Sequence, residues 1–218
     1  MEKRVKIGIV GVAGIAMIAL ATITGEAQAS SVPIVNPGFE LGLSGWSTFG
    51  NTFYVSNPNP VPDGAHGGTN SAKEFGTFPG VSGAFQTFAA SPGQTWDLQG
   101  FIINASSDAM QASAGNTNFA LVKISFQNSS STELLGIDSQ HITAATPQDI
   151  WENVDANGVA PAGTTQVQLF CLFVQPGTLG GSAGFDDISA TVVPEPSSVA
   201  LVLTGLGGLV MFARKRRV

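Results

Sequence analysis

Between residues 30 and 193 the sequence has no helical periodicity, and this feature constrains the fold most. Short runs rich in β-branched and aromatic residues alternate there with clusters of Gly, Pro, Asn and Ser. The pattern predicts eight strands, at residues 47–55, 83–89, 95–104, 118–126, 133–142, 150–154, 165–174 and 184–192. Because many short strands without helices pack best as two sheets, we predict an all-β, two-sheet antiparallel β-sandwich.

Two of these strands show which side chains should face the core. In residues 118–126, Val122, Ile124 and Phe126 alternate with Lys123 and Ser125, so the apolar set should point inward. A second inward row is predicted in residues 165–174: Val167, Leu169, Cys171 and Phe173. Since Cys171 is the single cysteine, an internal disulfide is excluded, and we expect it to be a small core residue rather than a reactive thiol.

The N-terminal 29 residues have the organisation of a secretory signal peptide. Lys3, Arg4 and Lys6 precede an uncharged stretch at residues 7–25, and small residues follow at Ala27 and Ala29. We therefore expect a signal helix at residues 1–29 that is cleaved after Ala29. The alternative is an uncleaved anchor.

The C-terminal segment, residues 194–218, has three parts. Pro194-Glu195-Pro196 stays extended because proline fixes φ and withholds its N–H. An uncharged apolar run follows at residues 199–213. Counted from Ser197, the segment has 17 residues and spans about 25 Å as a helix, so we predict a transmembrane helix in a hydrocarbon core of roughly 30 Å. A basic cluster closes the chain and should remain cytoplasmic: Arg214, Lys215, Arg216 and Arg217.

This tail resembles the PEP-CTERM sorting signal of exported Gram-negative bacterial proteins. The motif, the helix and the basic cluster occur in the order and spacing of that family. The resemblance implies an exosortase as partner, anchoring in the membrane during transit, and a final place at the cell surface or in the extracellular matrix. An ordinary single-span anchor is the alternative.

The charge between the two terminal segments is strongly negative. Lys73 and Lys123 are the two basic residues there. Thirteen acids follow from Ser30 onward, with Glu195 of the tail included, so the exported part without its basic cluster has a net charge of −11. Such a surface repels nucleic acid, so we expect no nucleic-acid partner. It suits an exported domain and can attract divalent cations.

The domain at residues 30–193 resembles the galactose-binding-like jelly roll of carbohydrate-binding modules. The resemblance rests on four stretches that occur in the family's order: residues 36–46 (Asn-Pro-Gly-Phe-Glu-Leu-Gly-Leu-Ser-Gly-Trp), 91–96 (Ser-Pro-Gly-Gln-Thr-Trp), 159–164 (Val-Ala-Pro-Ala-Gly-Thr) and 185–188 (Phe-Asp-Asp-Ile). It implies a jelly-roll topology in which Phe39 and Trp46 close one end of the sandwich.

The same resemblance implies a structural calcium ion between the first and last strands. It assigns Glu40 and Asp186 as carboxylate ligands, with Asp187 as the alternate, and backbone carbonyls near Gly38 and around Lys73. The alternative is that these acids are solvated or cap turns.

Catalytic residues are hard to find in the sequence. His66 and His141 are the two histidines, and neither has a partner at the spacing of a zinc site. Asp186 and Asp187 are a candidate carboxylate pair, but neighbours on a regular strand point to opposite faces. We therefore predict that the chain is not an enzyme.

Sugar-binding residues are also sparse. Trp46, Trp96 and Trp151 are expected in the core. The possible ligand-binding residues are the aromatics Tyr54, Phe75 and Phe78 and the amides Gln86, Gln166 and Gln168. The loops predicted at residues 70–78 and 105–118 could be plain connections.

Three functions remain. The first is a non-enzymatic surface or matrix protein sorted by its tail. The second is a module that binds exopolysaccharide, which an exposed aromatic row on one sheet would favour. The third is a glycoside hydrolase, which needs two carboxylates facing one cleft about 5–10 Å apart.

Overall fold

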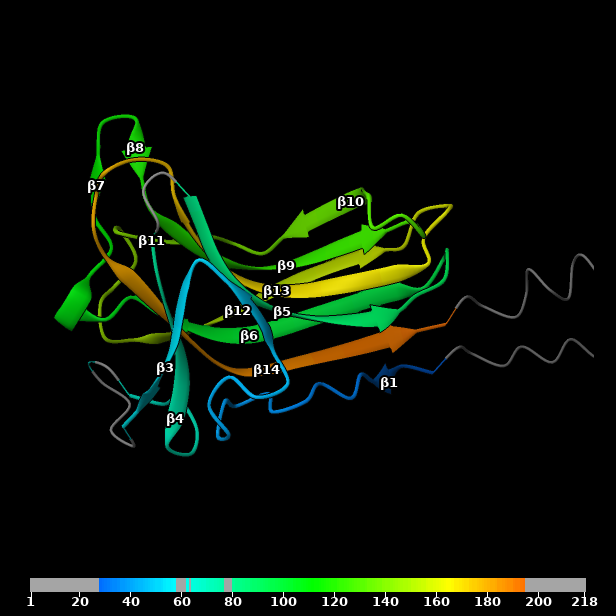
Figure 1. Ribbon diagram of the computed structural model, residues 1–218, viewed down its shortest axis with the longest axis horizontal. Coiled ribbons are helices and arrows are strands. Elements are labelled where there is room, and N and C mark those ends of the chain that lie inside the picture. The colour runs from blue at the N-terminus through cyan, green and yellow to red at the C-terminus, as the bar shows by residue number, and fades with distance from the viewer. Residues whose placement is uncertain (1–27, 58–61, 63, 77–79, 195–218) are drawn as a thin grey trace, which may run out of the picture.

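The chain folds as a β-sandwich of two antiparallel sheets (Figure 1). The computed structural model describes residues 28–57, 62, 64–76 and 80–194. The strands of the first sheet are, in order, β12 (Trp151–Val159), β6 (Thr95–Ile103), β14 (Ser182–Val193), β4 (Asn70–Phe75) and β3 (Asn51–Ser56), and β1 (Ser30–Ser31) also pairs with β14. The strands of the second sheet are, in order, β10 (Glu133–Asp138), β9 (Phe119–Gln127), β13 (Gln166–Gln175), β5 (Gly80–Ala89) and β2 (Ser47–Phe49), and β11 (Ile142–Thr143) also pairs with β9. The predicted all-β sandwich is confirmed.

Helix is limited to one 3-10 turn, Ser106–Asp108, in the described residues. Beside it, β7 (Ala112–Ser113) and β8 (Asn116–Thr117) form a small hairpin that projects from one end of the sandwich (Figure 1). The predicted signal helix and transmembrane helix lie outside the described residues. Within the described part, no helix is long and apolar enough to span a membrane.

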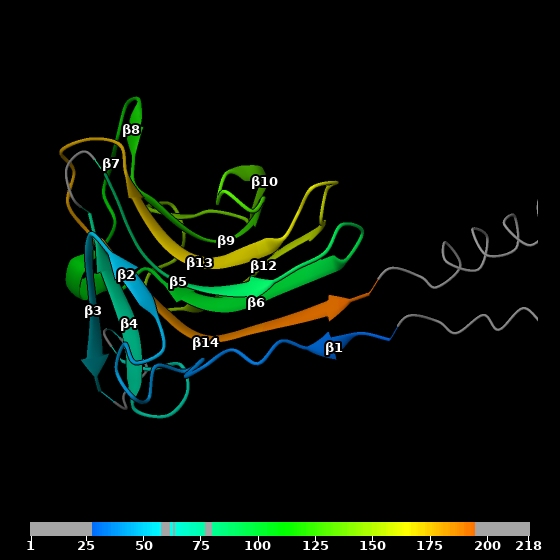
Figure 2. The ribbon, with the colours of Figure 1, turned by 45° about the vertical axis from the view of Figure 1, so that its right-hand side comes forward.

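The core lies between the two sheets, which are stacked in Figure 2. The two predicted inward rows are confirmed, because all seven of their side chains are buried: Val122, Ile124, Phe126, Val167, Leu169, Cys171 and Phe173. Phe39 and Trp46 stack on one another with ring centroids 5.0 Å apart and join this core. Trp96 is also buried, whereas Trp151 is half-buried.

The predicted strand at residues 47–55 is two strands that belong to different sheets. The break falls at Gly50, whose φ is +67°, so β2 joins the second sheet and β3 the first. A Cβ at this position would lie 2.8 Å from Cα of Ser82 and 2.9 Å from the carbonyl oxygen of Val81. Glycine therefore lets the chain cross from one sheet to the other.

The predicted loop at residues 70–78 is wrong in its first part, because Asn70–Phe75 forms β4, an inner strand of the first sheet between β14 and β3. The strand could not be recognised from the sequence because most of its residues are polar. Glu74 faces the core with 0% exposure, and no hydrogen bond within the described residues reaches either carboxyl oxygen. Burial raises the pKa of Glu74 well above its ordinary value, and the nearby backbone amides of Phe173 and Ala84 offset only part of this rise.

Two other predicted strands have different lengths. Residues 133–142 divide into β10 and β11, and residues 150–154 extend to Val159 as β12. The longer β12 pairs along all of its nine residues with β6.

Candidate binding site on the concave face of the second sheet

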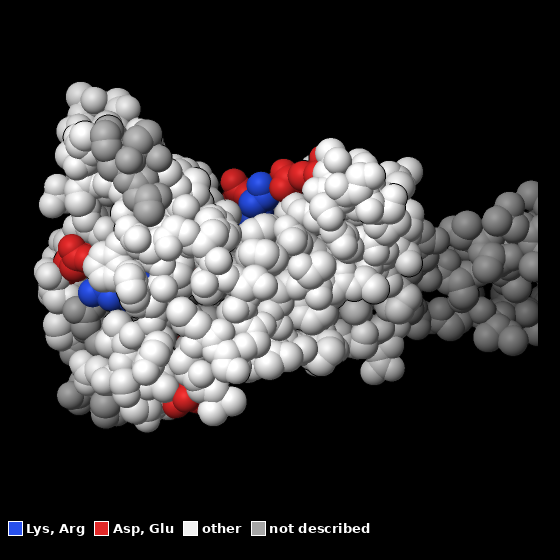
Figure 3. Space-filling view, in the orientation of Figure 1, with Lys and Arg blue, Asp and Glu red and all other residues white. Residues whose placement is uncertain are grey.

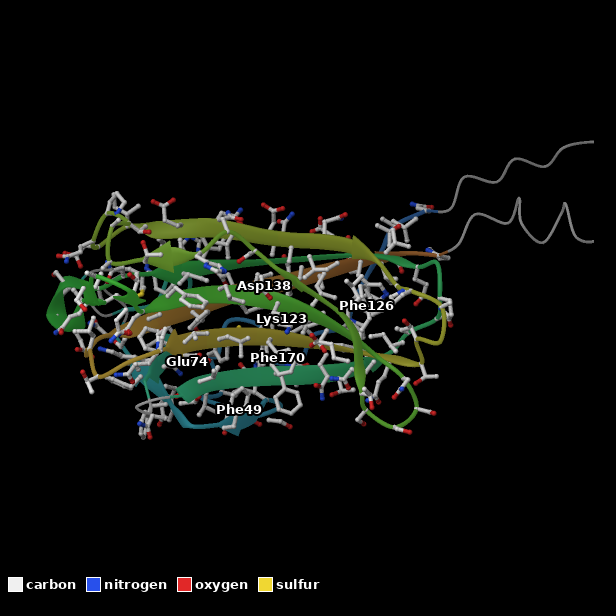
Figure 4. The ribbon with its side chains drawn as sticks, turned by 90° about the horizontal axis from the view of Figure 1, so that it is seen from above. Phe49, Glu74, Lys123, Phe126, Asp138 and Phe170 are labelled. Atoms are coloured by element: carbon white, nitrogen blue, oxygen red, sulfur yellow. The ribbon has the colours of Figure 1, made fainter. Side chains whose placement is uncertain are left out.

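The second sheet is curved with its outer side concave (Figure 2), and the space-filling view shows a hollow on this side, between the β7–β8 hairpin and the far ends of β9 and β10 (Figure 3). Strand register places one side chain from each of five strands, β2, β5, β13, β9 and β10, in a single row across this face. Going from one edge strand to the other, the row is Ser47, Phe85, Phe170, Lys123 and Asp138. Figure 4 looks onto this face and labels three members of the row, Phe170, Lys123 and Asp138. Residues that pair in this way share a face of the sheet and are direct neighbours.

Three phenylalanines on this face form what we call the phenylalanine platform: Phe49, Phe85 and Phe170. The Phe85 and Phe170 ring centroids are 5.1 Å apart, and Phe49 lies 6.3 Å from Phe85 and 6.4 Å from Phe170. Phe49 is 37% exposed. Gly83 lies beneath this ring, since a Cβ there would come within 2.7 Å of the Phe49 Cζ atom.

Hydrogen-bonding side chains fill the neighbouring rows, and we call them the amide network: Thr87, Ser125, Gln127, Gln166 and Gln168. The Gln166 Nε2 donates to Gln127 Oε1 at 2.8 Å, and Gln127 Nε2 donates to Gln168 Oε1 at 2.6 Å. Gln168 Nε2 then donates to Thr87 Oγ1 at 3.3 Å. The network holds three amides in fixed orientations beside the platform.

Charged side chains meet at the β9–β10 side of the face, where Figure 3 shows blue and red atoms in the hollow. The Lys123 ammonium lies 3.1 Å from a carboxylate oxygen of Glu133, and Ser125 Oγ donates to Glu133 Oε2 at 2.7 Å. Partial burial alone would raise the pKa of Glu133, but the hydrogen bonds from Ser125 and Lys123 and the Lys123 charge lower it overall. Glu133 is therefore ionised at neutral pH.

A register shift between Glu133 and Leu135 decides where these carboxylates point. Glu133 and Asp138 are five positions apart and would lie on opposite faces of a regular strand. Because β10 is irregular at its start, Glu133 pairs with Gln127 and Asp138 with Lys123, which are both outward positions of β9.

The predicted ligand-binding residues are divided between the two sheets. Gln166 and Gln168 belong to the amide network. Gln86 instead faces inward, where its Oε1 accepts from Val35 N and its Nε2 donates to Val35 O. Tyr54 and Phe75 lie in β3 and β4 of the first sheet, and Phe78 lies outside the described residues.

The sequence reasoning missed the three platform residues. Phe170 had a usable signal, because it occupies an outward position between the inward residues Leu169 and Cys171. Phe49 and Phe85 gave no such signal, since only strand pairing brings them beside Phe170.

The predicted calcium residues lie around a bulge in β14. A register shift between Asp186 and Ser189 and a φ of +48° at Asp187 interrupt the regular alternation. Both carboxylates consequently face the same side, with their Oδ1 atoms 3.5 Å (Asp186) and 3.3 Å (Asp187) from where a Cβ of Gly38 would be. The prediction that these neighbours point to opposite faces is therefore wrong.

Backbone and imidazole groups already contact these two carboxylates. Asp186 Oδ2 accepts from the backbone N–H of His66 at 2.7 Å and of Gly67 at 3.0 Å, while Asp187 Oδ2 lies 2.7 Å from His66 Nδ1. Burial raises the pKa of Asp186 to about 6. The amides of Gly67, Asp187 and His66 lower it and the Asp187 charge raises it further.

The remaining calcium residues are placed differently. Glu40 Oε1 accepts from the backbone N–H of Thr69 and Asn70. Lys73 lies in β4 between Gly184 and Phe53, so its backbone belongs to the sheet. No group of three or more His, Cys, Asp or Glu side chains in the described part could hold a metal ion. Asp186 and Asp187 supply two hard oxygens toward Gly38, which fits part of a calcium shell, and calcium stays a prediction.

The sorting motif begins where the described chain ends. Pro194 follows β14 directly. Glu195, Pro196 and the basic cluster Arg214, Lys215, Arg216 and Arg217 lie outside the described residues.

No protein-family profile matches the sequence, and no curated protein matches it. Solved structures do resemble the fold. A Stig cyclase, FisC from Fischerella sp. TAU, is 17% identical with a TM-score of 0.56, and the match covers 77% of this chain and 100% of the cyclase. An arabinose-bound α-L-arabinofuranosidase, MgGH51, is 14% identical with a TM-score of 0.53, over 78% of this chain and 27% of that one.

Carbohydrate-binding modules are also among the structural neighbours. TmCBM61, solved with β-1,4-galactotriose, is 17% identical with a TM-score of 0.48, over 71% of this chain and 94% of the module. At these identities the similarities to the cyclase and the arabinofuranosidase establish the sandwich fold alone. The cyclase similarities also correct one prediction: because cyclases share this sandwich fold, the prediction that the chain is not an enzyme, which rested on the lack of recognisable catalytic residues, does not stand.

Proposed function

We propose that this protein binds a glycan on the concave outer face of its second sheet. The observation that carries the proposal is the phenylalanine platform lying directly beside the amide network. A pyranose ring has an apolar face of C–H groups and a rim of hydroxyls. It therefore needs an aromatic surface together with fixed donors and acceptors, which is the usual composition of a small-molecule site.

The spacing of the face suits sugar rings. Adjacent strands lie about 4.8 Å apart, and successive residues on one face of a strand are about 6.6 Å apart. The row that holds Phe85 and Phe170 is followed directly by the row that holds Thr87 and Gln168. A ring stacked on the platform thus has its hydroxyls within reach of the amides.

The test is affinity electrophoresis of the full chain, in a polyoxyethylene detergent, through gels that contain a panel of polysaccharides. Phe170→Ala should weaken binding about tenfold, because it removes the central ring of the platform. The matched control is Phe53→Ala, which makes the same change at an exposed position of the first sheet. Equal retardation of the parent and Phe170→Ala would remove the platform from the proposal.

We further propose that the protein acts outside the cell after sorting through its tail. The support is in the sequence: the small-residue site before Ser30, and the Pro194-Glu195-Pro196 motif followed by an apolar segment and four basic residues. Mass spectrometry of the exported form should show a start at Ser30 and loss of the basic tail. A stable full-length chain in the membrane fraction would contradict this.

We also propose calcium as a structural ion at the β14 bulge. Two carboxylates that face one space repel when bare, and a dication reverses that interaction. Calcium would be held by Asp186 and Asp187, with Glu40 across the loop at residues 64–69.

A further inference from the structure

The concave face of the second sheet carries its own charge pattern. Lys123 and Lys73 are the two Lys or Arg side chains among the described residues, and Lys73 belongs to the other sheet, with its ammonium 5.2 Å from the Phe75 ring centroid. Lys123 is therefore the single described cation of the second sheet. It stands next to Phe170 in the platform row, where a bound glycan would meet it.

This ammonium is already engaged. It contacts Glu133 at 3.1 Å, and its end lies over Gly136, where a Cβ would come within 2.8 Å of both Cε and Nζ. Asp138 pairs with Lys123 in register and lies on the same face. An anionic ligand would have to displace Glu133 to reach the ammonium.

The local charge balance is one cation against two carboxylates. Asp138 is the last residue of the row that contains Phe85 and Phe170. Glu133 accepts a hydrogen bond from Ser125 of the amide network. A ligand carboxylate placed on the platform would therefore meet net negative charge, and Lys123, the one described cation of this sheet, is already paired with Glu133. Uncharged hydroxyls carry no such penalty.

Resting on glycan binding at this face, we propose that the site takes uncharged glycan segments and disfavours those bearing carboxylate or sulfate groups, with Glu133 and Asp138 as the specificity-determining residues. The amide network supplies donors and acceptors of no net charge, which suits hydroxyl groups. The two carboxylates act by repulsion, which often decides specificity between ligands that otherwise make the same contacts.

The experiment compares binding to one polysaccharide in an uncharged and a negatively charged form. A neutral hexose polymer that the parent binds is compared with the same polymer after oxidation of its C6 primary alcohols to carboxylates. The full chain, Glu133→Gln/Asp138→Asn and a control, Asp97→Asn/Asp155→Asn, are assayed by affinity electrophoresis. The control removes two carboxylates from β6 and β12 of the first sheet and changes the net charge equally.

At low ionic strength the parent and the control should bind the oxidised polymer about tenfold more weakly than the neutral one, as expected for like charges within several ångströms. In Glu133→Gln/Asp138→Asn the ratio of the affinity for the neutral polymer to that for the oxidised polymer should fall to about threefold or less. High salt should reduce the same ratio in the parent. Circular dichroism should show that all three are folded.

Each other result has a distinct meaning. If the parent binds the oxidised polymer as tightly as the neutral one, or if the ratio is unchanged in Glu133→Gln/Asp138→Asn, the charge selection is wrong while glycan binding stands. If the parent binds no polymer of the panel, glycan binding and the selection both fail.

Discussion

The concave face of the second sheet and the bulge in β14 both gather carboxylates, but they balance the charge in different ways. On the concave face, Glu133 receives hydrogen bonds from Lys123 and Ser125, and its pKa is lowered. At the bulge, Asp186 is buried, receives only backbone N–H groups and faces a second carboxylate, and its pKa is raised to about 6.

The difference lies in what each region still lacks. The concave face has its ammonium in place, so it can bind a neutral ligand without adding or losing an ion. The bulge has hydrogen-bond donors but no close cation among the groups that shift the Asp186 pKa, so added positive charge would stabilise it. We expect ions to act on the bulge and glycans on the concave face.

The largest expected effect is that of calcium on thermal unfolding. Binding to the folded state alone adds about 2.7 kcal/mol at a hundredfold excess over Kd, which corresponds to a rise in Tm of about 5–10 °C for a domain of this size. Tryptophan fluorescence of the full chain would be followed with calcium and with a chelator. Asp186→Asn and Glu40→Gln should remove the shift, whereas Phe170→Ala should keep it. Equal midpoints with calcium and chelator in the parent would rule the ion out.

The next effect concerns the buried carboxyl of Glu74. No cation is among the groups that shift its pKa, and the backbone amides of Phe173 and Ala84 offset only part of the effect of burial. Its folded pKa is raised above the ordinary value of 4.5, so its contribution to stability is full below that value and is lost as the pH rises toward the folded pKa. Glu74→Gln should remove this pH dependence and gain about 1–3 kcal/mol relative to the parent at alkaline pH.

Urea unfolding at acidic and alkaline pH measures this difference. Glu152→Gln, on β12, is the matched control and should follow the parent at both pH values. If the free energy of unfolding changes equally with pH in the parent and in Glu74→Gln, Glu74 does not titrate as its burial requires.

A smaller effect separates the two sides of β13. Cys171 is buried on the inner side, while Phe170 belongs to the platform on the outer side. Cys171→Ala should cost of order 1 kcal/mol of unfolding free energy, as expected for a small buried group, and should leave glycan retardation unchanged. A loss of binding at unchanged Tm would mean that the thiol has a role beyond packing.

The smallest effect is expected at the ion pair of the concave face. Glu133→Gln should lower stability at neutral pH by at most about 0.5 kcal/mol, because solvent screens a partly exposed pair. Since the folded pKa is lowered, this contribution is present at neutral pH and is lost as the pH falls through that pKa. Parent and variant should therefore unfold alike in acid, and a difference that persists there would place the effect outside the ion pair.

The class of fold and the inner faces of β9 and β13 could be predicted from the amino-acid sequence. Val122, Ile124 and Phe126 could be assigned because the period of two is a local property of the chain, and a one-residue error would expose the whole apolar set. The same alternation placed Lys123 outward and Cys171 in the core. Gln166 and Gln168 were named as possible ligand residues, but nothing local showed that they bond to a common neighbour, Gln127.

The two sites depend on contacts between distant chain segments and could not be predicted from the sequence. Phe49, Phe85 and Phe170 form one platform because β2, β5 and β13 pair side by side, a choice made by chain segments far apart in sequence. The bulges in β10 and β14 change the side of the sheet on which Glu133 and Asp187 lie. Residues 70–75 form the strand β4 because β14 and β3 pair with its backbone on both sides. The physical reason is common to all three: local spacing fixes which residues alternate, whereas long-range pairing and burial fix which alternating sets meet.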